Sequence, residues 1–200
     1  MMNYSAAHRK ALTDFGKASL EEMVASCGYP VEGNSFKVKF LDQEFTVEHP
    51  SGRFYPEPAP EGELPIFAQI LVLHYLTNTT TRPEEGRLIT YKELPGGNIY
   101  IQPFTNRAIR PLVQLFGNRA ERLVEVAGQI GGSAVKHGDA AVCIPVFPRI
   151  PVTLVVWAGD DEFPASGNIL FDASAPAFLH TEDYAVLASF VVGTLKRLSN

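Results

Sequence analysis

Short runs of alternating hydrophobic and polar residues predict β-strands in both halves of the chain. The clearest run is 35–40, where Phe36, Val38 and Phe40 alternate with two lysines, as expected for a half-buried strand. Further strand-like runs lie at 45–47, 99–101, 140–147, 152–157 and 169–171. Because several neighbouring runs are joined by short turns, we expect mostly antiparallel pairing.

Helical patterns fill most of the remaining sequence. Residues 64–76 are apolar nearly all round a helical wheel, which predicts a central helix buried on most sides. Amphipathic spacing predicts further helices at 5–15, 19–27, 105–116, 118–127 and 181–198. In the last of these, Thr181 is the expected N-cap, and Glu182 and Asp183 in the first turn suit the helix dipole. The sequence therefore predicts an α+β fold, with a mostly antiparallel sheet of about five strands and helices packed around it.

Length and composition indicate one domain. A chain of 200 residues with 46% hydrophobic content can bury a sizeable core. The segment 49–62 is rich in proline, glycine and glutamate, and proline interrupts regular structure. We interpret it as an internal loop of a single α+β domain covering 1–200, and a domain boundary there is the alternative.

Charge and hydropathy argue against nucleic-acid and membrane partners. The net charge is −5 and there is no run of lysine or arginine, whereas nucleic acids and anionic membranes attract basic surfaces. The longest apolar stretch, 64–76, is shorter than the ~20 residues that a membrane span needs. The N-terminus lacks the pattern of a secretory signal. We expect a soluble, cytoplasmic protein.

Three carboxylates follow the strand-like run 152–157. Asp160, Asp161 and Glu162 stand between Gly159 and Phe163, and Asp172 would lie near them if the runs 152–157 and 169–171 pair. Such a group can bind a divalent cation or raise the pKa of one carboxyl for acid–base chemistry. The alternative is a solvated turn, with Asp172 capping the next turn through backbone N–H groups.

Three further residues are candidates for a ligand site. His74 lies near the end of the central helix, where it can bind a metal or haem or form a hydrogen bond inside the fold. Asp139 precedes one strand and Trp157 ends another. We expect the ligand-binding residues to be among six candidates: Asp161, Glu162, Asp172, His74, Trp157 and Asp139.

Several sequence phrases together resemble a known family. In order they are LVLHYL, ITYKELPGG, LFGN, HGDAAVCIPVFPRIPVTLVVWAGDDEFP and ILFDASAPAFL. The series resembles the uncharacterised bacterial and archaeal family called domain of unknown function 3786, over nearly the whole chain. Signature positions of the family that recur here are Gly97, Asp139, Asp161, Glu162, Phe163, Pro164 and Asp172.

The resemblance implies a protein of anaerobes, and it implies relatives that join this domain to a cysteine-rich iron–sulfur segment or are named as iron–sulfur proteins. This chain departs from that pattern. Its two cysteines, Cys27 and Cys143, cannot supply the four ligands of a cluster within one chain, so no iron–sulfur cluster is expected from them.

Three functional hypotheses follow. The first is a non-catalytic ligand-binding or accessory protein of anaerobic redox, iron–sulfur or corrinoid metabolism, with a redox or corrinoid protein as partner. The alternative is a divalent-metal-dependent hydrolase that uses the turn 160–162, which requires its carboxylates and that of Asp172 to converge within about 5 Å. The third is a homo-oligomer in which a second chain covers Phe147, Trp157 and Phe163.

Overall fold

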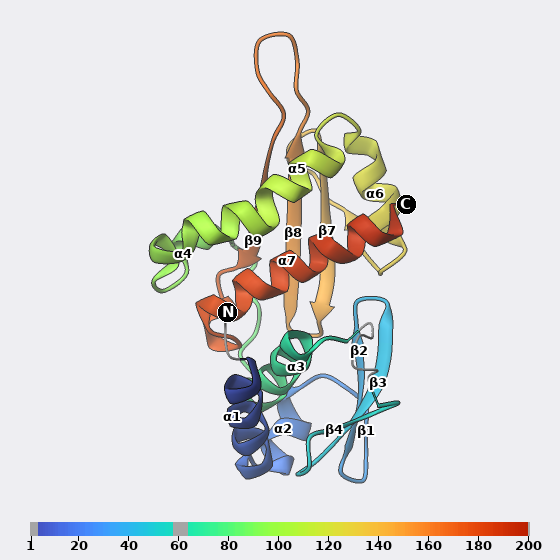
Figure 1. The fold of residues 1–200 in the computed structure, drawn as a ribbon, viewed down its shortest axis with the longest axis vertical. Coiled ribbons are helices and arrows are strands. Elements are labelled where there is room, and N and C mark those ends of the chain that lie inside the picture. Colours follow the sequence, from blue (N-terminus) through green and yellow to red (C-terminus); the bar gives the residue numbers. More distant parts are fainter. Residues whose placement is uncertain (1–3, 58–63, 200) are drawn as a thin grey trace.

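The computed structural model describes residues 4–57 and 64–199. Figure 1 shows two sheets placed end to end along the molecule, one in each half of the chain. Both sheets are antiparallel, with strand orders β1-β2-β3-β4 and β5-β9-β8-β7-β6. The predicted α+β class is confirmed, although the strands divide between two sheets instead of one.

The described part of the N-terminal half contains the smaller sheet and helices α1 to α3. Its elements are α1 Tyr4–Lys17, α2 Leu20–Ser26, β1 Val31–Glu32, β2 Ser35–Phe40, β3 Gln43–Glu48, β4 Arg53–Tyr55 and α3 Ile66–Asn78. As predicted, Phe36, Val38 and Phe40 of β2 are buried and the lysines between them are exposed. The expected loop 49–62 contains strand β4. This strand forms there because it pairs with β3, and Phe54 packs against Phe45 of β3. Residues 58–62 of that loop lie outside the described residues.

Helix α3 is the predicted central helix. It is shifted by two residues from 64–76 and is buried on most sides. Helix α1 packs along it, with Phe15 fully buried between the two helices and the sheet. Within the described residues, no helix combines the length and the apolar character needed to cross a lipid bilayer.

The C-terminal half contains the larger sheet. Its elements are β5 Leu88–Thr90, η1 Tyr91–Glu93, α4 Gly97–Phe104, η2 Thr105–Ile109, α5 Arg110–Phe116, α6 Ala120–Gly128, β6 Ser133–Ala134, β7 Ala140–Phe147, β8 Ile150–Trp157, β9 Ser166–Asp172, η3 Ala175–Ala177 and α7 Thr181–Leu198. In Figure 1, α4 to α5 form one long helical rod beside α7, and both cross the sheet.

The strand predicted at 99–101 is wrong, because these residues belong to α4. Gly96 has a left-handed backbone (φ 72°) and starts the helix, a conformation that glycine adopts without steric cost. The pattern at Ile99 and Ile101 is too short to distinguish a strand from a helix. Ile99 is 78% exposed, so it packs in neither a sheet nor the core.

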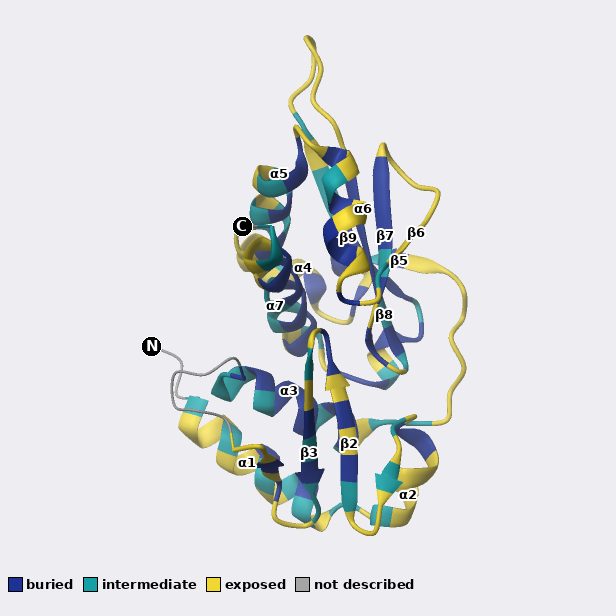
Figure 2. Ribbon diagram, turned by 90° about the vertical axis from the view of Figure 1, so that its right-hand side faces the viewer, coloured by how far each residue is buried: buried dark blue, intermediate teal, exposed yellow. Residues whose placement is uncertain are grey.

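Stacked aromatic rings join the two halves. Phe147, at the end of β7, stacks on Tyr75 of α3 with ring centroids 4.4 Å apart and on Phe40 of β2 at 5.0 Å. Phe40 also stacks on Phe190 of α7 at 5.2 Å. The tip of the β2–β3 hairpin therefore reaches the C-terminal half, as Figure 2 also shows. One hydrophobic core spans both halves.

Candidate functional site

The residues predicted for a ligand site do not gather in one place. Asp139, Trp157, Asp161 and Glu162 lie around the β8–β9 hairpin, which projects beyond the sheet in Figures 1 and 2. Asp172 lies at the other end of β9, and His74 belongs to α3 in the N-terminal half.

The carboxylates of the hairpin are either bound to backbone or open to solvent. Asp139 accepts a hydrogen bond from the backbone N–H of Ala158 at 2.8 Å. Asp160 accepts from the backbone N–H groups of Phe163 at 2.7 Å and Glu162 at 2.9 Å, and these bonds lower the pKa of Asp160. Asp161 and Glu162 are exposed. This arrangement is that of a structured, solvated turn.

Aromatic residues accompany this turn. Trp157 is 37% exposed and meets the ring of His137 edge to face, with centroids 6.0 Å apart. Phe163, in the loop, is 67% exposed. An exposed phenylalanine on a projecting loop contributes little to the core of its own chain.

Asp172 has a structural role. Its buried carboxylate accepts hydrogen bonds from the backbone N–H groups of Glu85, Gly86 and Ser174, at 2.8–2.9 Å. Burial alone would raise the pKa of this carboxyl, but the hydrogen bonds outweigh it and the pKa is lowered. Asp172 therefore holds the segment before β5 and the turn after β9, which is the capping alternative of the sequence analysis.

The expected convergence of Asp161, Glu162 and Asp172 is not found. The runs 152–157 and 169–171 do pair, but as an antiparallel hairpin, in which only the start of the second strand lies near the turn. A strand rises about 3.3 Å per residue, so Asp172 at the far end of β9 lies about 20 Å from the loop. Among the described residues, no group of three or more His, Cys, Asp or Glu side chains is placed to hold a metal ion.

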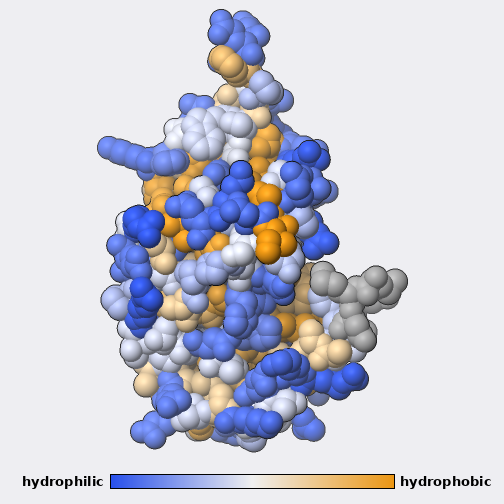
Figure 3. Space-filling view, turned by 90° about the vertical axis from the view of Figure 1, so that its left-hand side faces the viewer, coloured by the Kyte–Doolittle hydropathy of each residue, from blue (hydrophilic) through white to orange (hydrophobic). Residues whose placement is uncertain are grey.

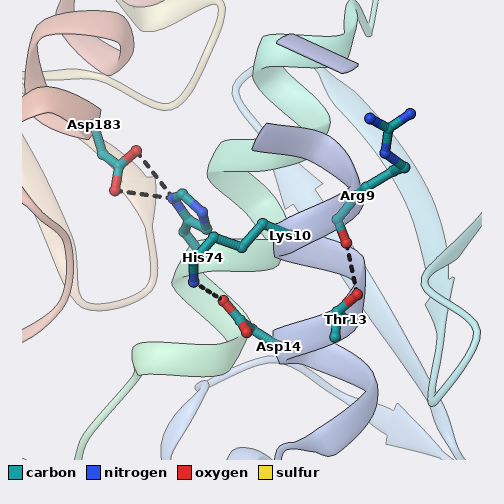
Figure 4. A network of polar contacts seen from close by, with 6 residues as sticks. All are labelled: Arg9, Lys10, Thr13, Asp14, His74 and Asp183. Atoms are coloured by element: carbon teal, nitrogen blue, oxygen red, sulfur yellow. Dashed lines mark hydrogen bonds and ion pairs between the residues drawn. The ribbon is translucent and has the colours of Figure 1, made fainter. Parts of the chain in front are cut away.

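His74 is paired with a residue that the sequence analysis did not place in a site. Its Nδ1 lies 3.0 Å from each carboxylate oxygen of Asp183, in the first turn of α7. Figure 4 shows the ring directed from α3 toward α7, with the Lys10–Asp14 pair of α1 beside it. The side chains of His74 and Asp183 are 28% and 12% exposed, so the pair is partly shielded from water.

Asp183 gave one signal in the sequence. It stands four residues before Leu187, on the face of α7 that packs inward, because residues four apart share one side of a helix. A carboxylate on a buried face normally has a partner. The sequence alone could not identify that partner, because His74 is 109 positions away.

Two cavities adjoin at this pair. The first, of about 410 Å³, is lined by Pro95, Tyr100, Pro176, Leu179, His180 and Thr181, together with His74, Glu182 and Asp183. The second, of about 270 Å³, is lined by Tyr4, Ala7, Phe67, Ile70, Leu71 and Val186, together with the same three residues. We call the two cavities together the His74 groove. The first volume falls within the range of about 300–1,000 Å³ that is typical of small-molecule sites, and the second is slightly smaller.

The groove lies between the start of α7, α4 and the α1–α3 pair. Figure 3 shows the side of the molecule on which α4 and the start of α7 lie, where hydrophobic side chains are interspersed with hydrophilic ones. The first cavity is the more polar end of the groove and the second is the more apolar end. A ligand with a polar head and an apolar body would match this division.

The His74–Asp183 pair presents one free ring nitrogen. A carboxylate on Nδ1 fixes the orientation of an imidazole and leaves Nε2 for a ligand, a proton or a metal. Within the described chain, Asp183 is the only hydrogen-bond partner of the His74 ring. The cysteines lie elsewhere: Cys27 is buried beside Tyr29, and Cys143 is in β7.

Fold and groove together define an α+β protein with a candidate small-molecule site at a His–Asp pair. The chain matches the family model described as Domain of unknown function (DUF3786) over residues 19–194, nearly its whole length. It therefore belongs to that family, as its sequence phrases implied. No curated protein and no solved structure matches the chain.

Proposed function

We propose that the protein is a non-catalytic ligand-binding protein whose site is the His74 groove. The observation that carries this proposal is the position of the His74–Asp183 pair, which lies where the two cavities adjoin. Pairing with Asp183 orients the ring before any ligand arrives, and such preorganisation lowers the entropic cost of binding.

Two hydroxyl groups of the groove, those of Tyr100 and Thr181, support binding over catalysis. A histidine that acts as general base needs a nucleophile within hydrogen-bond reach. The Tyr100 hydroxyl instead donates to Glu182 at 2.7 Å, and the Thr181 hydroxyl donates to the carbonyl oxygen of Pro95 at 2.7 Å. Both hydroxyls have partners other than His74.

The proposal can be tested with a thermal-shift screen of small aromatic and aliphatic molecules that carry one polar group. A ligand at 100 times its dissociation constant stabilises the folded state by about 2.7 kcal/mol. We expect His74→Gln to abolish this stabilisation, and His137→Gln, at the far end of the molecule, to leave it unchanged. Hits that stabilise the His74→Gln variant as well as the wild type would place binding outside the groove.

A protein-contact role for the β8–β9 hairpin is the second candidate. The 67% exposure of Phe163 favours it, since exposed aromatic side chains are common anchors in protein interfaces. The neighbouring Asp161 and Glu162 favour a partner with a basic surface. Two copies meeting tip to tip would bring these carboxylates together, so a homo-oligomer would need another arrangement of the hairpins.

The setting that we propose follows from the sequence and the family resemblance. It is the cytoplasm of an anaerobic prokaryote, with a redox or corrinoid protein as the partner. The His74 groove is small for a whole corrinoid, because drug-sized ligands already fill sites of about 300–1,000 Å³. A corrinoid is therefore tested while bound to its partner protein and not as a free ligand of the groove.

A further inference from the structure

We propose that the His74 groove binds a small organic cation, namely an amine carried on an apolar body. The inference rests on the proposed function and adds the charge and hydrogen-bonding character of the ligand. Three properties of the groove carry it: the Tyr100 and Thr181 hydroxyls already donate to other groups, His74 and Glu182 offer acceptor atoms, and the described lining has two carboxylates but no lysine or arginine.

Two hydroxyl donors in the first cavity of the groove are already used. The Tyr100 hydroxyl hydrogen points to Glu182 and that of Thr181 to the Pro95 carbonyl, so both oxygens face a ligand only as acceptors. The bond to Glu182 also raises the pKa of Tyr100. Pro95 and Pro176 add no backbone N–H, since proline lacks one.

His74 adds an acceptor at the centre of the groove. In the neutral ring, the Nδ1 hydrogen is donated to Asp183, so Nε2 carries the lone pair. Glu182 contributes a carboxylate with one oxygen, Oε1, bound to Tyr100. A ligand that satisfies these atoms must donate several hydrogen bonds, and an ammonium group donates three.

The charge of the lining favours the same ligand. Glu182 and Asp183 line both cavities, and the described lining includes no lysine or arginine. The N-terminus of α7 contributes roughly +0.5 of an elementary charge, which does not balance the negative charges of the two carboxylates. His180 lies at the polar end. Lys10, on α1, pairs with Asp14.

The second cavity supplies space for an apolar body. Tyr4, Phe67 and Leu71 are among its lining residues, and the rings of Tyr4 and Phe67 lie 6.2 Å apart. An apolar cavity of about 150 Å³ accepts benzene, so 270 Å³ has room for a phenyl ring or a branched alkyl chain. An arylalkylamine would thus place its ring at the apolar end and its ammonium group near Glu182 and His74.

The test compares three probes with the same ring: 2-phenylethylamine, 2-phenylethanol and 3-phenylpropanoate. Binding to the whole protein is measured by calorimetry and by the NMR signals of ¹⁵N-labelled histidine rings. We expect the amine to shift the His74 signals and to bind at least about tenfold more tightly than the carboxylate.

Two matched variants locate the charge effect. Glu182→Gln should weaken amine binding about tenfold, because it removes a charged acceptor but keeps the size of the side chain. Glu125→Gln, which changes an exposed glutamate on α6, should leave it unchanged. If the carboxylate or alcohol binds as tightly as the amine, the ligand class is wrong although the groove still binds ligands. If no probe shifts the His74 signals, both the ligand class and the binding function are contradicted.

Discussion

At the scale of residues, the donors around each carboxylate decide what it does in this protein. Asp172 is buried and accepts three backbone N–H groups, so its charge stabilises the fold. Asp183 is buried and orients His74. Asp161 is exposed on the projecting hairpin. All three residues are aspartates, and their different surroundings give them three different roles.

We expect Asp172→Asn to lower the free energy of unfolding by about 1.5–3 kcal/mol at neutral pH, because charge-assisted hydrogen bonds are lost. The pKa of Asp172 is lowered in the folded state, so the folded protein binds fewer protons than the unfolded one. The stabilisation is therefore complete above the unfolded pKa of about 3.9 and is lost as the pH falls through the lower folded pKa.

Urea unfolding of the wild type and Asp172→Asn between about pH 7 and pH 3 measures this effect around the ordinary aspartate pKa. The difference between the two proteins should shrink in acid. Asp161→Asn is the control, since its exposed side chain should make no difference at any pH. A difference that stays constant into acid would contradict a stabilising charge at Asp172.

At the scale of elements, the β8–β9 hairpin combines a buried stem with an exposed loop. Phe171 in β9 is fully buried and packs edge to face against Tyr184 of α7 at 4.9 Å. Phe163 in the loop is 67% exposed. The same residue type therefore serves the core at one end of the hairpin and is available for contact with another molecule at the other.

We expect Phe163→Ala to change the free energy of unfolding by less than about 0.5 kcal/mol, whereas Phe171→Ala should cost about 3–5 kcal/mol. Chemical denaturation measures both. A large loss for Phe163→Ala would show that the loop packs on its own chain. Light scattering on the same samples tests self-association: a smaller mass for Phe163→Ala than for the wild type would implicate the hairpin, and equal masses would argue against it.

At the scale of the whole molecule, the two sheets are joined by one core. Tyr75, Phe147, Phe40 and Phe190 come from four elements in both halves and form a continuous stack. The groove shares this dependence on both halves, since His74 comes from α3 and Asp183 from α7. Loss of contact between the halves would separate the pair.

We expect a single cooperative unfolding transition, as the predicted single domain requires. Differential scanning calorimetry should give equal calorimetric and van't Hoff enthalpies. Phe147→Ala should lower the stability of the whole molecule by about 3–5 kcal/mol, with Ile99→Ala at an exposed position as the control. Two separate transitions in the wild type would show instead that each sheet folds as its own domain.

Local patterns in the sequence determined much of the secondary structure. The alternation at 35–40, the apolar helix near 64–76, and the strands at 140–147 and 152–157 were all predicted and observed. These features depend on the periodicity of neighbouring residues, which a single sequence displays. The N-cap of α7 was misplaced by one residue: His180 is the cap, and Thr181 starts the helix and donates its hydroxyl to Pro95.

Only the tertiary structure decided how these elements meet. In the structure the strands belong to two sheets, residues 99–101 are part of a helix, and Asp172 lies far from the acidic turn. The fold also brings Asp183 to His74 across 109 positions of the chain. The sequence identified His74 as a candidate but not its partner, because pairing between distant residues depends on how the entire core packs and leaves no local pattern.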